Sequence, residues 1–171
     1  MSFVDDLLTQ AEHLTDWDET RPKQANLRRS VSTAYYALFH QLTDASASFL
    51  VSGSGPGRDA LRKALRRAFA HTDMMKLSKS FAGRAPPNAW KSAAGSISND
   101  LKFVADAFVE IQQARHEADY DHTRKWTKQQ AREVVMRARA AIDAWERVKG
   151  GQDACAYLVA LLTNKLSKGP S

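Results

Sequence analysis

An arginine and a histidine occupy positions where the apolar pattern of the chain calls for aliphatic side chains. Apolar residues recur from Ile97 to Ile111 at alternating steps of four and three, and the same rhythm then reaches Arg115, Ala118 and His122. Residues at this spacing lie on one face of a helix. Because a guanidinium on an apolar face costs free energy unless it is paired, we expect Arg115 and His122 to form a candidate functional site.

The segment around this pair suits phosphoryl chemistry on RNA. Arg115 can hold a phosphate by bidentate hydrogen bonds and offset charge in the transition state, while His122 can move the proton of the attacking or leaving oxygen. Asp119 is placed to pair with the arginine and to orient the histidine. His116, next to Arg115, is a reserve candidate for proton transfer. A salt-bridge cluster at a helix end is the alternative explanation of the same residues.

An earlier segment adds residues that can bind substrate. Arg28 lies seven residues before Tyr35, on the inner side of a predicted helix, and needs an anion: an acid such as Asp119 or a phosphate. We expect Tyr35 to be a core residue. Tyr36 and His40, four apart, either line a cleft beside it or simply pack.

The net charge of +6 is unevenly distributed. Residues 58–91 and 124–149 are strongly basic, whereas residues 1–20 and 92–122 are acidic. Two basic segments around an acidic one suggest a polyanion partner such as RNA, although solvated helix faces account for the charges equally well. Within the first basic segment, Arg58, Arg62 and Arg66 fall on one helical face, which either follows an RNA backbone or is solvated.

The elements that must position these residues are all predicted to be helices. Pro22 suits the first turn of the second helix, either Ser96 or Ser98 is a plausible N-cap of the fourth, and Thr127 with Gln130 fits a capping box that opens the fifth. Gly150-Gly151 ends that helix. The expected helices cover residues 3–15, 22–51, 58 to 71 or beyond, 96 or 98 to the 115–122 region, 127 to 149, and 153–166, with loops at 53–57 and 83–88. The fold class is therefore an all-α antiparallel bundle of five to six helices.

The length and composition of the chain limit the kinds of protein that it can be. A chain of 171 residues with four tryptophans can bury a substantial core. A single cysteine, Cys155, excludes an internal disulfide, suggests no cysteine-based metal site and fits a reducing cytoplasm. No apolar run approaches the roughly 20 residues that a membrane span needs. We expect a cytoplasmic protein with no membrane partner, no metal and no cofactor.

Two motifs together resemble those of HEPN-domain proteins. The first, Arg28-Arg29-Ser-Val-Ser-Thr-Ala-Tyr35-Tyr36-Ala-Leu-Phe-His40, is similar to the family's second-helix signature; the second, Arg115-His-Glu-Ala-Asp119-Tyr120-Asp, is similar to its late-helix signature. The resemblance covers roughly residues 3–149. It implies a HEPN-like helical bundle over residues 1–150, with a C-terminal helix and tail at 151–171 outside it.

The resemblance also implies a function. Many family members are homodimeric, metal-independent ribonucleases of toxin–antitoxin or phage-defence systems, in which an arginine followed after four to six residues by a histidine forms the site. Here six residues separate Arg115 from His122, and the commoner spacing would place the histidine at Tyr120. In toxin-type members a nucleotidyltransferase antitoxin modifies a tyrosine near the site, and Tyr120 is the analogous candidate.

These observations lead to one main hypothesis and two rivals. The main one is an RNA- or nucleotide-binding protein with endoribonuclease activity. The first rival is a non-catalytic module that associates with a nucleotidyltransferase or a second protomer, and the other is a structural bundle. The candidate catalytic residues are Arg115, His122, Asp119 and His116, and the candidate substrate-binding residues are Arg28, Arg29, Tyr36, His40, Tyr120, Arg62 and Arg66.

Overall fold

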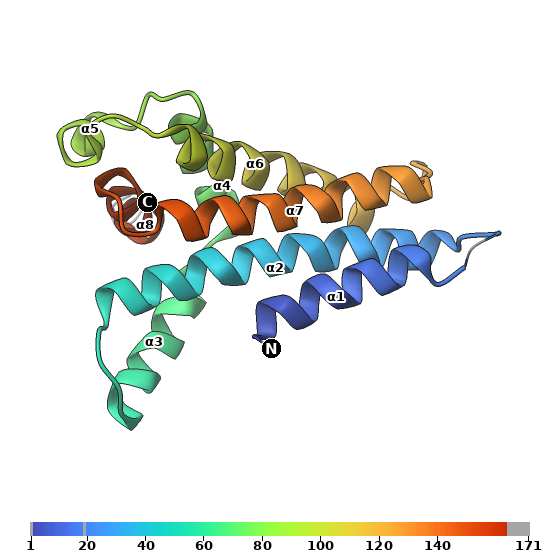
Figure 1. Cartoon of the computed structure of the whole chain (residues 1–171), viewed down its shortest axis with the longest axis horizontal. Coiled ribbons are helices and arrows are strands. Elements are labelled where there is room, and N and C mark those ends of the chain that lie inside the picture. Colours follow the sequence, from blue (N-terminus) through green and yellow to red (C-terminus); the bar gives the residue numbers. More distant parts are fainter. Residues whose placement is uncertain (1, 19, 164–171) are drawn as a thin grey trace. The chain divides into compact units, whose positions relative to one another are not determined.

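The computed structural model describes residues 2–18 and 20–163, and every regular element in these ranges is an α-helix (Figure 1). The all-α class is therefore confirmed, but the expected number of five to six helices is too low for the part described. The eight helices are α1 (Phe3–Asp16), α2 (Gln24–Leu50), α3 (Pro56–Ala68), α4 (His71–Ala82), α5 (Asn88–Ala94), α6 (Asn99–Tyr120), α7 (Lys128–Val148) and α8 (Gln152–Thr163).

Side-chain caps define the starts of three helices. Ser2 and Asp5 form a capping box at α1. The Ser98 hydroxyl accepts a hydrogen bond from the Leu101 amide before α6, at 3.2 Å. Before α7, Thr127 and Gln130 satisfy each other's backbone amides. The cap at Ser98 and the capping box at Thr127 are thus confirmed, whereas Pro22 precedes α2 rather than lying in its first turn.

Two features account for the additional helices. The chain becomes extended at Phe69 and Ala70, which separates α3 from α4 without a glycine or proline at the break. The short helix α5 begins at Asn88, the last residue of the expected loop at 83–88, and is followed by Gly95, whose φ of 62° favours glycine. The last helix ends at Thr163, and residues 164–166 of its expected range lie outside the described part.

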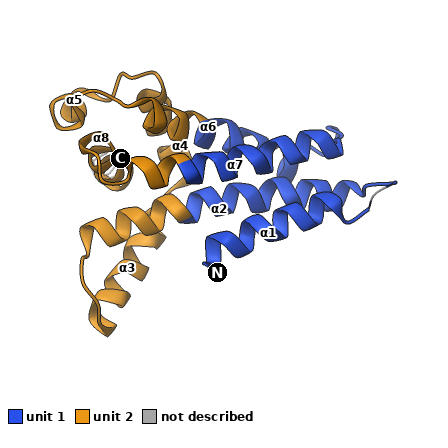
Figure 2. Cartoon of the chain, viewed as in Figure 1, with its two compact units in different colours: residues 1–40, 107–143 blue, residues 41–106, 144–171 orange. Residues whose placement is uncertain are grey.

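The chain divides into two compact units, each made of separate stretches of sequence (Figure 2). Unit 1 comprises residues 1–40 and 107–143; unit 2 comprises residues 41–106 and 144–171. Helices α2, α6 and α7 each contribute to both units. The boundary at residue 150 stays a prediction; in this division α8 belongs to the same unit as residues 41–106.

Unit 1 buries an apolar cluster where α2 meets the end of α6 and the start of α7. Leu27 and Val31 of α2 pack there with Ala118, Trp126 and Ala131. Tyr35 is fully buried as well, and its ring lies 5.8 Å from that of Phe108. The expectation that Tyr35 is a core residue is confirmed. This packing fixes α2 beside the segment that carries Arg115.

Unit 2 has its own core, in which α8 takes part. Tyr157 of α8 is fully buried, its ring lies 5.0 Å from that of Phe81, and its hydroxyl is 2.8 Å from that of Ser78. Burial raises the pKa of Tyr157 well above its ordinary value, and the Ser78 hydrogen bond offsets only part of that effect. The α8 helix is therefore an integral part of the unit 2 core.

Candidate functional site

Helix α6 ends before it reaches His122. Its last residue is Tyr120, and Asp121 then accepts hydrogen bonds from the Thr123 amide at 2.9 Å, the Thr123 hydroxyl at 2.6 Å and the Arg124 amide at 3.3 Å. A carboxylate that binds backbone amides two and three residues ahead favours a turn over a further helical turn. His122 is exposed in that turn. The expectation that Arg115 and His122 share one continuous helical face is therefore wrong.

Arg28 stabilises this helix end from α2. Its guanidinium donates hydrogen bonds to the carbonyl oxygens of Ala118 at 2.7 Å and Asp121 at 2.9 Å, and also to that of Arg124. The last carbonyls of a helix have no partner within the helix and carry partial negative charge. The hydrogen-bond acceptors of Arg28 are thus backbone carbonyls, where the sequence predicted a side-chain acid or a phosphate. They are supplied by the carboxyl end of α6 and the turn that follows.

Arg115 lies on α6 among three tyrosines and one acid. Its Nε is 2.7 Å from Oδ2 of Asp119, and its Nη2 donates a 3.2 Å hydrogen bond to the Tyr36 hydroxyl. Its guanidinium carbon is 5.7 Å from the ring centres of Tyr35, Tyr36 and Tyr120. The ion pair with Asp119, expected from their spacing, is confirmed.

Burial and neighbouring charges shift the pKa of Arg115 in opposite directions. Partial burial alone would lower the pKa of its guanidinium, but interactions with Tyr36 and Asp119 outweigh burial and raise that pKa above its ordinary value. Asp119 is held in turn by the Ser32 hydroxyl, which donates to its Oδ1. The Asp119 carboxylate therefore orients Arg115. Its second partner is Ser32, whereas the sequence predicted His122.

The other residues expected at the site lie on two helices of unit 1. On α6, His116 and Tyr120 are exposed, and their ring centres are 5.0 Å apart. On α2, His40 packs against the rings of Phe3 and Tyr36 at 5.2 and 6.3 Å. Arg115, His116 and Tyr120 therefore form a small, partly exposed cluster, with Tyr36 and Asp119 at its inner edge. Arg29, also on α2, is exposed.

Two arginines of α3 in unit 2 form contacts within their own unit. Arg62 donates to the carbonyls of Val51 at 2.7 Å and Gly53 at 2.8 Å, and it pairs with Asp59 at 2.6 Å. Arg66 forms an ion pair with Asp44. The row that was expected to be solvated or to follow an RNA backbone thus faces its own unit.

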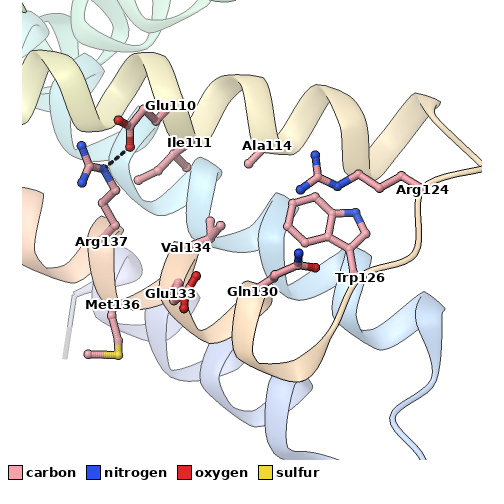
Figure 3. Close-up of a pocket in the computed structure, with 10 residues that line it drawn as sticks. All are labelled: Glu110, Ile111, Ala114, Arg124, Trp126, Gln130, Glu133, Val134, Met136 and Arg137. Atoms are coloured by element: carbon pink, nitrogen blue, oxygen red, sulfur yellow. Dashed lines mark ion pairs between the residues drawn. The ribbon is translucent and has the colours of Figure 1, made fainter.

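A groove that the sequence reasoning missed lies between α6 and α7 in unit 1 (Figure 3). Its volume is about 570 Å³. Ile111, Ala114 and Val134 supply apolar lining, and the guanidinium of Arg124 lies 4.3 Å from the ring centre of Trp126 at one end. An ion pair of 2.6 Å between Arg137 and Glu110 lies at the other end. Only the aromatic Trp126 beside Arg124 could have indicated this groove in the sequence.

Two kinds of site are not found in the described residues. Within residues 2–18 and 20–163, no three His, Cys, Asp or Glu side chains are grouped so that they could hold a metal ion. Nor is any helix of these residues long and apolar enough to cross a membrane.

The chain matches no protein-family model, no curated protein and no solved structure. Its function must therefore be inferred from the geometry of its own residues.

Proposed function

We propose that this chain is a HEPN-type protein that binds RNA or a nucleotide at the cluster of Arg115, His116 and Tyr120. The observation that carries the proposal is the placement of Arg115, whose guanidinium is oriented by Asp119 and Tyr36 beside two exposed rings. An oriented guanidinium is suited to a phosphate, and exposed aromatic rings are suited to unstacked bases.

The cluster offers a distinct role to each side chain. A phosphate oxygen accepts from Arg115 by replacing its bond to the Tyr36 hydroxyl, while Asp119 keeps the guanidinium in position. Tyr120, 62% exposed, supplies a ring on which a base stacks. Arg29, exposed on α2, adds positive charge to unit 1. Arg28, Arg62 and Arg66 act on structure in this scheme and do not bind RNA.

The reaction that we propose for the bound RNA is cleavage without a metal ion. A histidine takes the proton of the ribose 2′-OH, the 2′-oxygen attacks phosphorus and the bond from phosphorus to the 5′-oxygen breaks. The protonated histidine or a water molecule returns a proton to the 5′-oxygen, which gives a 2′,3′-cyclic phosphate and a 5′-hydroxyl. His116 shares helix α6 with Arg115, whereas His122 lies beyond its end. His116 is thus the first candidate for proton transfer and His122 the second. Such an activity would suit a toxin or phage-defence nuclease.

Binding is tested with a fluorescent single-stranded RNA in an anisotropy titration at low salt. We expect Arg115→Gln to weaken binding by about tenfold, because a charge-assisted hydrogen bond contributes about 1.5–3 kcal/mol. Arg137→Gln is the matched control, since Arg137 also belongs to an ion pair of unit 1, with Glu110. Equal affinities of the two variants would overturn the proposal.

Cleavage is tested with the same RNA in excess chelator, followed by end-group analysis. We expect a 2′,3′-cyclic phosphate from the wild-type chain, and a loss of at least about a hundredfold in rate for the variant of the acting histidine. His116→Ala and His122→Ala are measured separately, because the geometry ranks them differently. If both variants cleave as fast as the wild type, neither histidine transfers the proton.

A second candidate is a non-catalytic module that binds a second protomer or a nucleotidyltransferase. The observation in its favour is that Arg115 already bonds to Asp119 and Tyr36, as expected of an ion-pair network at an interface. This candidate predicts that the chain does not cleave RNA and that Arg115→Gln weakens self-association in sedimentation velocity. A monomer at high concentration that still binds RNA would exclude the homodimeric form.

A further inference from the structure

Helix α3 exposes much of its apolar side to solvent, although Leu65 on that side is half-buried. None of its residues is buried. Leu61 is 57% exposed, and the row Ala60, Ala64 and Ala68 is exposed as well. Residues four apart lie on one side of a helix, so this row and Leu61 form a continuous apolar strip.

The opposite, arginine-rich side attaches α3 to unit 2. Arg62 reaches the carbonyls of Val51 and Gly53, Arg58 donates to the carbonyl of Ser52, and Arg66 pairs with Asp44. The loop of residues 51–55 is shaped for these bonds, because Gly53 and Gly55 have φ angles of 84° and 121° that favour glycine. The orientation of α3 is thus set by polar contacts.

Two cations border the exposed strip. Lys63 and Arg67 are four residues apart on the edge next to the alanine row; both are exposed, and neither forms an ion pair with another described residue. Just before the loop, the last turn of α2 adds two bulky apolar side chains, Phe49 at 48% and Leu50 at 41% exposure. Unit 2 therefore exposes apolar and cationic side chains on neighbouring segments of chain.

We propose that α3 docks on an anionic membrane surface, with Leu61 and the alanine row in the headgroup region and Lys63 and Arg67 among lipid phosphates. Charge complementarity favours this occupant. Helix α3 carries five basic residues and one acid, so a symmetrical contact between α3 helices of two copies would bring like charges together. An RNA backbone would satisfy the cations but would leave the apolar strip in water. A basic amphipathic helix at an anionic bilayer satisfies both features.

This contact is peripheral and differs from a membrane span, for which no described helix is suited. It would correct the sequence expectation of no membrane partner. It is also independent of the Arg115 cluster, which lies in unit 1.

The test is co-sedimentation of the full chain with two kinds of vesicle. One is made of phosphatidylcholine alone, and the other also contains about 30% phosphatidylserine, which gives an anionic surface. We expect binding only to the anionic vesicles and release as salt screens the charges. Leu61→Ser should weaken binding about fivefold, and Lys63→Glu with Arg67→Glu by more than about tenfold.

Matched controls separate this surface from general effects. Met136→Ser removes another large exposed apolar side chain, 67% exposed, and Lys91→Glu with Lys102→Glu makes the same change of net charge at other exposed sites of unit 2. Both controls should bind vesicles like the wild type, and circular dichroism should show the same helix content in all variants.

Three outcomes would overturn the proposal. The first is no binding to anionic vesicles. The second is binding that Leu61→Ser leaves unchanged, which would indicate a purely electrostatic surface of the kind that binds RNA. The third is lipid-free self-association that Leu61→Ser abolishes, which would identify a second copy as the occupant.

Discussion

Arg28 and Arg115 both lie on helix sides that face protein, and each is compensated in a different way. Arg115 is paired with a carboxylate and surrounded by tyrosines. Arg28 has three backbone carbonyls as partners, supplied by the end of α6 and the turn behind it. The first arrangement leaves the Arg115 guanidinium partly exposed. In the second arrangement, the hydrogen bonds of the Arg28 guanidinium hold the turn that carries His122.

At the residue scale, we predict that Arg28→Met destabilises unit 1 by about 2 kcal/mol, because several carbonyls lose a charged donor. Arg29→Met is the control: Arg29 is the exposed neighbour, and its loss should change the free energy of unfolding by less than about 0.5 kcal/mol. Urea denaturation of both variants provides the measurement. Equal stabilities would show that water replaces the guanidinium at these carbonyls.

The residue pattern predicted part of the candidate site. The pair of Arg115 and Asp119 followed from a spacing of four within one helix, which is a local property. The partners Ser32 and Tyr36 did not follow, because they come from α2 and depend on how two helices pack. Sequence spacing cannot supply that register when a single chain is all that is known.

Among elements, the end of α6 has the largest effect on the site. The periodic pattern continues past Tyr120, and neither glycine nor proline follows to indicate a stop. The physical cause of the stop is the carboxylate of Asp121, which binds the amides of Thr123 and Arg124. An aspartate two residues before a threonine was the available signal for a turn.

At this scale we predict that the contribution of Asp121 to the stability of the fold depends on pH. Hydrogen bonds from the Thr123 hydroxyl, the Thr123 amide and the Arg124 amide hold the pKa of Asp121 below its ordinary value of 3.8. A carboxyl with a lowered pKa stabilises the fold above its ordinary pKa, and this contribution is lost as pH falls through the folded pKa.

Asp121→Asn keeps an acceptor but not the charge, so its melting temperature should lie below that of the wild type at pH 7. The difference should begin to narrow below about pH 4, the ordinary pKa range of this carboxyl, and should close as pH falls through the lower folded pKa of Asp121. Thermal melts of both chains from pH 3 to pH 7 measure it. A difference that stays constant over this range would exclude a role for the charge.

Strong local signals predicted elements well, and weak ones did not. Ser98 and Thr127 act as caps because their hydroxyls reach amides three residues ahead, which needs no tertiary contact. Helix α5 is only seven residues long, too short for periodicity to show, and it depends on packing against α8. The break at Phe69 and Ala70 has no local signal either.

For the whole molecule, α8 matters more than its place at the end of the sequence suggests. It packs against α4 and α5 within unit 2, and Tyr157 joins the ring of Phe81 and the hydroxyl of Ser78 in the core. Because most apolar side chains of α8 are buried, this helix stabilises the helices that it contacts.

We therefore predict that a chain shortened to end at Gly150 loses the order of unit 2. Amide hydrogen exchange in α4 and α5 should accelerate at least about tenfold, because their opening no longer costs contacts with α8. A chain that ends at Thr163 is the control, since it retains α8, and it should exchange like the full chain. Unchanged protection in the shorter chain would mean that α4 and α5 are stable without α8.

The shared helices α2, α6 and α7 have a consequence for synthesis on the ribosome. Unit 1 needs residues 1–40 together with residues 107–143, and all of 41–106 is made between them. The apolar side chains Leu27 and Val31 of α2 must therefore wait for Ala118, Trp126 and Ala131 until most of the nascent chain has emerged. We expect unit 1 to fold late in translation. Until then, chaperones can bind the exposed apolar side chains of the N-terminal helices.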